Sequence, residues 1–275
     1  MFGEVRFEVL GPVRGWRGET ELELGSPQQR AVLAMLLLAR GRQVSLDGLI
    51  DGLWGDQVPR SAVGTVRTYV SRLRGACSMT TRDSGDLITP IGDGYLLRLG
   101  LAVLDLDLFE GWLREARVAR GRREAAHSAR LLRDAHGLWG GDALAGVPGP
   151  YADSRRASLA ELQLAATEEK LTADISLGEH ASAIAELRAL LAAHPFREGL
   201  SELLMLALYR SGRQAEALDV FDAARRGLRG ALGIDPGPSL RAMQQRVLQA
   251  DRRLMDSADL SPMHLVHAAG ASRVA

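Results

Sequence analysis

The chain contains 275 residues, of which 46% are hydrophobic, so it is long enough to bury the cores of about two domains. Its 34 basic and 34 acidic residues cancel, which argues against a protein that attracts nucleic acid through a general excess of positive charge. The single cysteine, Cys77, excludes an internal disulfide, and the sequence shows neither a signal peptide nor an apolar run of membrane-spanning length. We therefore expect a soluble, cytoplasmic protein.

The N-terminal part of the chain predicts strands followed by a buried helix. Apolar and polar residues alternate from Val5 to Val9 and again after a glycine-rich turn, which indicates a hairpin or small sheet over residues 5–24. Pro27 suits the first turn of a helix that runs from Gln28 to about Ala39. The apolar block inside this helix predicts burial on nearly every side.

Two more helices and a hairpin are expected next. Ser45 is a suitable N-cap for a short helix, and a third helix is predicted over residues 61–76. Two apolar runs around a Gly-Asp-Gly tip predict a hairpin over residues 87–99. Strands, three helices and a closing hairpin follow this order in winged helix-turn-helix domains, so we expect an α+β domain of that kind over residues 1–100.

Helical periodicity replaces the strand pattern in the rest of the chain, and it predicts an all-α domain over residues 105–254. A glycine- and proline-rich loop is expected inside it over residues 137–150, and residues 256–275 are expected to form a flexible tail. One pattern recurs after 34 residues: Gly178, Ala183, Leu187 and Leu190 are repeated as Gly212, Ala217, Phe221 and Ala224. Small residues that let two helices approach, beside larger ones that fill the adjacent space, are typical of tetratricopeptide-like repeats.

The third helix has one apolar and one polar face. Helical spacing predicts a core-facing stripe of Val63, Val66, Val70, Leu73 and Cys77. The candidate DNA contacts on the other side of this helix are Thr65, Arg67, Thr68, Ser71, Arg72 and Arg74. Five arginines and no acid lie between Arg60 and Arg82, so the local charge is +5. Short hydroxyl side chains let a helix enter the major groove deeply, and guanidinium groups can donate two bonds to guanine or phosphate.

An amphipathic helix with outward arginines is, taken alone, most often a solvated helix. The position of this one, after a short helix and before a hairpin, favours a recognition helix instead. The hairpin would then be the wing, with Thr89 and Tyr95 as candidate contacts to the DNA backbone. Tyr95 is also a good candidate for a core residue.

Catalytic motifs are missing from the sequence. It contains no GxxxxGK, GxSxG or HExxH pattern, and His127 and His136 have no third metal ligand in a suitable place. Cys77 completes the apolar stripe and is interpreted as a core residue. We therefore expect no enzyme activity, no cofactor and no metal.

Longer segments resemble the Streptomyces antibiotic regulatory protein family. The resemblance is carried by PQQRAVLAMLLLARGRQVSLDGLIDGLWGDQVPRSAVGTVRTYVSRLRGAC, GYLLRL, LDLDLFEGWLREAR, LLAAHPFREGL and YRSGRQAEALDVFDAARRGLRGALGIDPGPSLRAMQQRVL, and it covers roughly residues 4–250. It implies a DNA-binding domain like the output domain of OmpR- and PhoB-type regulators, followed by a bacterial transcriptional activation domain.

The resemblance also implies a function. Members of the family bind direct repeats in promoters of secondary-metabolite (antibiotic) gene clusters and recruit RNA polymerase with its sigma factor. By this resemblance two copies would bind double-stranded DNA head to tail, in the cytoplasm at the nucleoid, and the recognition positions would fall on the six residues of the third helix named above. Gly64, where members often carry Asn, and Ile91 and Asp93 at the wing tip depart from the family pattern.

Two hypotheses from different classes follow from these observations. The first is a sequence-specific DNA-binding transcriptional activator. The second is a helical-repeat scaffold whose winged helix docks another protein. The composition of the recognition face favours the first, and DNA binding that weakens steeply with salt would distinguish the two.

Overall fold

The computed structural model describes three stretches of the chain, residues 5–77, 87–100 and 102–256. They form two compact units: the described residues of the first are 5–77, 87–100, 102–115 and 133–164, and those of the second are 116–132 and 165–256. These units are defined by packing, whereas the domains expected over residues 1–100 and 105–254 are defined by sequence pattern and stay predictions. The tail expected after residue 256 lies outside the described residues.

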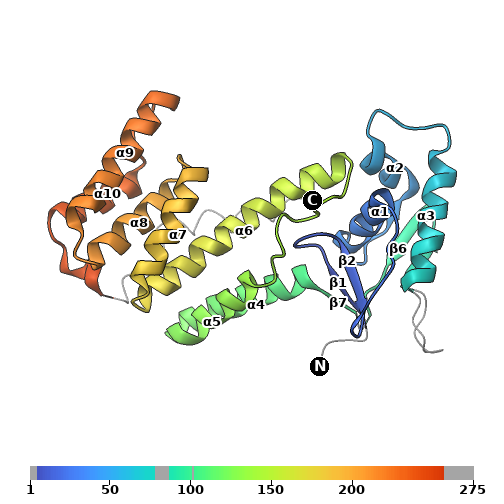
Figure 1. The fold of residues 1–275 in the computed structure, drawn as a ribbon, viewed down its shortest axis with the longest axis horizontal. Coiled ribbons are helices and arrows are strands. Elements are labelled where there is room, and N and C mark those ends of the chain that lie inside the picture. Colours follow the sequence, from blue (N-terminus) through green and yellow to red (C-terminus); the bar gives the residue numbers. More distant parts are fainter. Residues whose placement is uncertain (1–4, 78–86, 101, 257–275) are drawn as a thin grey trace. The chain divides into compact units, whose positions relative to one another are not determined.

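A four-stranded sheet opens the first unit (Figure 1). In spatial order its strands are β3 (Thr20–Glu21), β2 (Arg14–Arg17), β1 (Val5–Glu8) and β7 (Val103–Leu104). Strand β1 pairs antiparallel with β2 and parallel with β7, so the sheet joins the start of the chain to a segment almost 100 residues later. The sequence predicted the early strands but not β7, because two residues are too few to show an alternation.

Three helices follow the first strands, as the sequence predicted: α1 (Pro27–Leu38), α2 (Leu46–Trp54) and α3 (Ala62–Cys77). Ser26 caps α1 and Ser45 caps α2, because each hydroxyl accepts a hydrogen bond from a backbone N–H three residues further on, at 3.3 and 3.0 Å. Helix α1 is buried on nearly every side, and both α2 and α3 pack against it.

A second sheet of three strands forms the wing. Its spatial order is β4 (Val44–Ser45), β6 (Gly94–Leu97) and β5 (Ile88–Ile91), and all neighbours are antiparallel. A Cβ atom at Gly94 would lie 2.1 Å from the carbonyl oxygen of Val44, so only glycine lets β4 approach β6 this closely. The α+β winged helix predicted from the sequence is thereby confirmed.

Parts of two long helices complete the first unit. Helix α4 (Asp105–Gly121) begins with the buried Asp105, whose carboxylate accepts hydrogen bonds from the backbone N–H groups of Val9 and Leu10. Helix α6 (Pro150–Ser176) follows the predicted glycine- and proline-rich loop. Arg156 of α6 holds this loop by donating to the carbonyl oxygens of Leu144 and Val147, at 3.0 and 2.9 Å.

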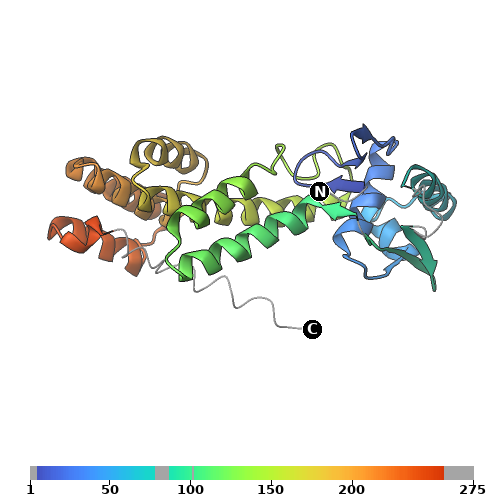
Figure 2. The ribbon, with the colours of Figure 1, turned by 90° about the horizontal axis from the view of Figure 1, so that it is seen from below.

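All regular secondary structure in the described residues of the second unit is helical. Besides the later parts of α4 and α6 it contains most of α5 (Ala125–His136), whose last turn belongs to the first unit. It also contains α7 (His180–Ala193), α8 (Glu198–Arg210), α9 (Gln214–Leu232), α10 (Pro238–Leu248) and a 3₁₀ turn (Arg252–Met255). Helix α8 packs against α7, α9 and α10, and Figure 2 shows α7 and α8 side by side. This part of the fold is the helical-repeat architecture that the sequence predicted.

The repeated positions have the same burial and the same glycine backbone feature in both copies of the 34-residue repeat. Ala183 and Ala217 are buried to 1% and 0% exposure, and the larger Leu187 and Phe221 are buried to 0% and 3%. The glycine before each repeated helix, Gly178 and its counterpart Gly212, has a positive φ, which ends the preceding helix in the left-handed region. The physical reason for the repeat is therefore the one expected from the sequence.

Candidate nucleic-acid interface

Helix α3 is fixed against the rest of the winged helix by two polar contacts and one apolar stripe. The Tyr69 hydroxyl donates to Oε1 of Gln28 on α1 at 2.7 Å, and Arg17 of β2 donates to the carbonyl oxygen of Ala76 at 3.2 Å. Val66, Val70, Leu73 and Cys77 are buried, as predicted. The remaining surface of α3 is consequently held in a defined orientation.

The prediction that Val63 belongs to the core stripe is wrong. Its side chain is 42% exposed, whereas the neighbouring Ala62 is buried. On the helical wheel Ala62, Val66, Val70, Leu73 and Cys77 occupy one arc, and Val63 lies about 60° from its centre, in the first turn of the helix. Val63 thus lies at the edge between the buried arc and the exposed face of α3.

Small residues occupy the middle of the exposed face of α3. Gly64, Thr68, Ser71 and Gly75 are exposed and are spaced by four, three and four residues, so they form one stripe along the helix. Among the described residues, no atom outside the neighbouring helix backbone lies within 4 Å of a Cβ placed on Gly64 or Gly75. This stripe lets the helix backbone approach a flat or grooved partner closely. Gly75 was missed in the sequence analysis, although its helical angle places it beside Ser71.

The predicted arginines flank this stripe. Arg67 and Arg72 are exposed on opposite sides of it, and within the described residues neither makes an ion pair. Arg74 lies on the same side as Arg67, but it is half-buried and interacts with another group. Arg82, counted in the local charge, lies outside the described residues. The structure therefore gathers two unneutralised guanidinium groups around a surface of small side chains.

Two of the predicted hydroxyl contacts bond to their own helix. Thr65, which is half-buried, donates to the carbonyl oxygen of Ser61 at 3.0 Å, and the exposed Thr68 donates to that of Gly64 at 2.9 Å. Either hydroxyl would have to rotate before it could donate to a phosphate. In their present rotamers both oxygens can still accept a hydrogen bond. Ser71 is exposed.

The wing carries the last predicted site residue. Thr89 is half-buried on β5, opposite Leu96, and β5 packs against α3. Tyr95 is half-buried and pairs with Val44 of β4. At the tip, Gln43 donates to the carboxylate of Asp93 at 2.9 Å, so the wing presents a tethered acid where a DNA-reading wing would need a cation.

The other groups considered as chemical sites have structural explanations. Burial raises the pKa of the Cys77 thiol to about 11, so this side chain stays a protonated core residue. Among residues 5–77, 87–100 and 102–256 no cluster of His, Cys, Asp or Glu is arranged to hold a metal ion. In the same stretches, no helix has the length and apolar character needed to cross a bilayer.

Two family models match the chain in the order of its predicted domains. Residues 19–97 match "Transcriptional regulatory protein, C terminal", and residues 104–248, more than half of the chain, match "Bacterial transcriptional activator domain". Together with the winged helix, these matches define a transcriptional regulator. Regulatory protein DnrI of Streptomyces peucetius is 34% identical over 90% of this chain and 93% of its own. The chain belongs to the Streptomyces antibiotic regulatory protein family.

Other relatives are longer proteins. Regulatory protein AfsR of Streptomyces coelicolor is 52% identical over 92% of this chain, and AfsR of Streptomyces griseus is 50% identical over 93% of it. The chain spans about a quarter of the length of these two proteins. A solved structure of Mycobacterium tuberculosis EmbR in complex with a low-affinity phosphopeptide matches with a TM-score of 0.82 and 33% identity, over 90% of this chain and 66% of that one.

Proposed function

We propose that the protein activates transcription by inserting α3 into the major groove of promoter DNA and recruiting RNA polymerase. The observation that carries the proposal is the exposed face of α3, where small side chains allow close approach and Arg67 and Arg72 are available to bases or phosphates. Family membership supports an activator over the alternative of a scaffold that docks proteins.

Each of the predicted residues has a role in this proposal. Arg67, Arg72 and Arg74 bind guanine edges or phosphates, and Thr65, Thr68 and Ser71 contact the walls of the groove. Thr89 of the wing contacts the adjacent backbone. With an acid at its tip the wing contributes less to binding than α3 does.

The proposed target is a direct repeat in the promoter of a secondary-metabolite gene cluster, bound by two copies head to tail. Such an arrangement needs a contact between different surfaces of the two copies, unlike the two-fold dimers that bind palindromes. The helical repeats of the second unit then contact RNA polymerase and its sigma factor. The proposal implies that the protein works in the cytoplasm, at the nucleoid.

Genome-wide footprinting with the purified protein tests this function. We expect protected sites upstream of biosynthetic genes, each with two half-sites in the same orientation, and we expect transcription in vitro from such a promoter to rise when the protein is added. The matched control is the R67A/R72A variant, which should protect none of these sites. Protected inverted repeats would contradict the head-to-tail arrangement, and protection without increased transcription would contradict activation.

A further inference from the structure

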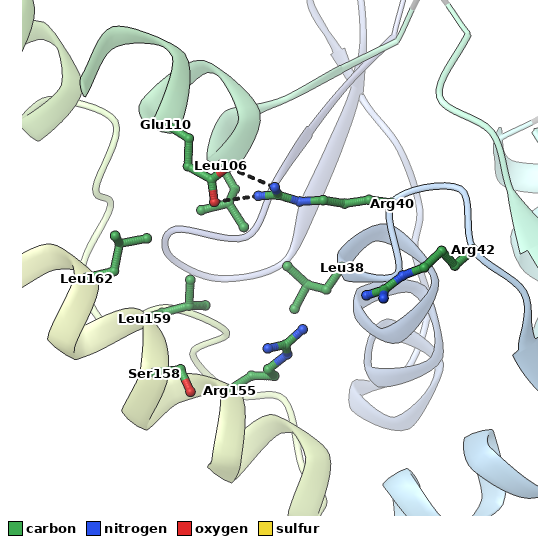
Figure 3. Close-up of a pocket in the computed structure, with 9 residues that line it drawn as sticks. All are labelled: Leu38, Arg40, Arg42, Leu106, Glu110, Arg155, Ser158, Leu159 and Leu162. Atoms are coloured by element: carbon green, nitrogen blue, oxygen red, sulfur yellow. Dashed lines mark hydrogen bonds and ion pairs between the residues drawn. The ribbon is translucent and has the colours of Figure 1, made fainter. Parts of the chain in front are cut away.

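A cavity of about 400 Å³ lies within the first compact unit, and none of the described residues that line it belongs to α3. It is lined by Leu38, Arg40, Arg42, Leu106, Glu110, Arg155, Ser158, Leu159 and Leu162 (Figure 3). These residues come from the end of α1, the turn after it, the first part of α4 and the first part of α6. Cavities of about 300 to 1,000 Å³ are typical of small-molecule sites.

The cavity has an apolar floor. Leu38, Leu106 and Leu159 are buried to between 4% and 6% exposure, and the half-buried Leu162 adjoins them. Figure 3 shows these leucines on the inner walls, with the polar groups around them. A floor of this kind favours a ligand with a hydrocarbon body, because covering apolar side chains with apolar groups removes them from contact with water.

One wall of the cavity is fixed by a bidentate ion pair. Arg40 donates to both carboxylate oxygens of Glu110, at 2.6 and 2.8 Å, and lies 3.5 Å from Asp107. The backbone of Arg40 has a φ of 50°, in the left-handed region that side chains other than glycine seldom adopt. The ion pair therefore holds a strained turn against α4 and neutralises this guanidinium.

Two further guanidinium groups at the cavity have no acidic partner among the described residues. Arg42 donates to the carbonyl oxygen of Ala39 at 3.3 Å, and Arg155 donates to the Tyr151 hydroxyl at 3.3 Å, with its guanidinium 5.6 Å from that ring. Figure 3 shows both side chains directed into the space between α1 and α6. Three arginines against one glutamate leave the lining with a net positive charge.

The geometry points to a binding site for a small organic anion, with its apolar body on the leucine floor and its carboxylate between Arg42 and Arg155. Guanidinium groups bind carboxylates through paired charge-assisted hydrogen bonds. A nucleic-acid backbone fits the two cations but not the floor, because phosphodiesters offer nothing apolar to fill it. The site does not depend on the proposed DNA contacts of α3.

Calorimetric titration of the full chain with cinnamate, an aromatic carboxylate, tests the proposal. We expect saturable binding to one site, and we expect cinnamamide, which has the same body without the charge, to bind at least about tenfold more weakly. The R42A/R155A variant should also lose at least about tenfold in affinity for cinnamate. Ser158→Trp places an indole at an exposed lining position and should block binding while both arginines remain.

The matched control is R98A/R122A, which removes two exposed arginines outside the cavity and should bind cinnamate as the wild type does. Absence of saturable binding at millimolar cinnamate, or equal affinities for cinnamate and cinnamamide, would overturn the proposal. It would also be overturned if R42A/R155A weakened binding to DNA and left cinnamate binding unchanged, since the two cations would then be a phosphate contact.

Discussion

Replacing Arg72 with alanine is expected to weaken binding to a DNA fragment selected by the wild-type protein by about 1 to 3 kcal/mol. Arg72 is exposed beside the small-residue stripe of α3 and forms no ion pair within the described part of the chain, so its guanidinium is available to a base edge. Electrophoretic mobility shift or fluorescence anisotropy measures the change. The matched control is Arg122→Ala, at an exposed position in the second unit, for which we expect no change in affinity.

Base and phosphate contacts can be separated with the same variants. If Arg72 binds a guanine, R72A should lose discrimination at one base pair of the half-site. A fragment altered at that base pair should then have the same affinity for R72A as for the control variant Arg122→Ala. If Arg67 binds a phosphate, R67A should weaken binding to all fragments equally. Unchanged affinity and unchanged base preference in both variants would show that α3 is not the reading helix.

Asp105→Ala is expected to reduce the free energy of unfolding by about 2 to 4 kcal/mol. The carboxylate of Asp105 accepts bonds from the N–H groups of Val9 and Leu10 at 2.8 and 2.9 Å, and alanine would leave both buried donors without a partner. Each orphaned donor costs about 1 to 3 kcal/mol, and release of the buried charge offsets part of the total. Urea denaturation followed by circular dichroism measures the loss. A change below about 1 kcal/mol would contradict this role.

The same residue gives the stability a pH dependence with a defined sign. Burial raises the pKa of Asp105 from 3.8 to about 6, although the N–H groups of Leu10, Val9 and Leu106 act in the opposite direction. The folded state therefore binds the proton more tightly than the unfolded state does. The stabilisation that comes from this tighter proton binding is fully present below pH 3.8. It is lost as the pH rises from 3.8 to about 6, and above that pH Asp105 causes no further change.

Asp105→Asn isolates this effect, because the amide keeps an acceptor and does not titrate. As the pH rises from 4 to about 6, the wild type should lose stability relative to D105N, because only the wild type has a titrating group at this position. All other groups titrate in both proteins, so their effects cancel in the difference. A difference that is constant over this interval would contradict the raised pKa.

Local patterns in the sequence were sufficient for most of the helices. The apolar block of α1, the Ser45 cap and the 34-residue repeat each depend on residues close to one another, so periodicity and capping chemistry predict them. The angular position of the α3 residues was equally accessible. Val63 was the exception, because its helical angle lies about 60° from the centre of the buried arc, outside the positions that the core covers.

Contacts between distant segments were not accessible from the sequence. Residues 103–104 form strand β7 because they pair with the edge of β1. Asp105 accepts a hydrogen bond from the N–H of Val9, which lies 96 residues earlier in the chain but next to it in space. Arg42 and Arg155 both line the proposed anion cavity, and neither residue belongs to a recognisable sequence motif. Of the candidate site, the α3 residues were predicted from helical angles, and their contacts with DNA stay predictions.

The dependence of DNA affinity on salt tests the central claim, that the arginines of α3 bind DNA, most directly. The measurement is the binding constant of the wild type and of R67A/R72A for one selected fragment over a series of salt concentrations. The logarithm of the wild-type constant should fall linearly with the logarithm of the salt concentration, with a slope of about −0.9 for each phosphate neutralised. The slope should become shallower by about one for each phosphate contact that the variant loses. Affinity that is independent of salt, or equal affinities of the two proteins for the fragment at every salt concentration, would contradict the account.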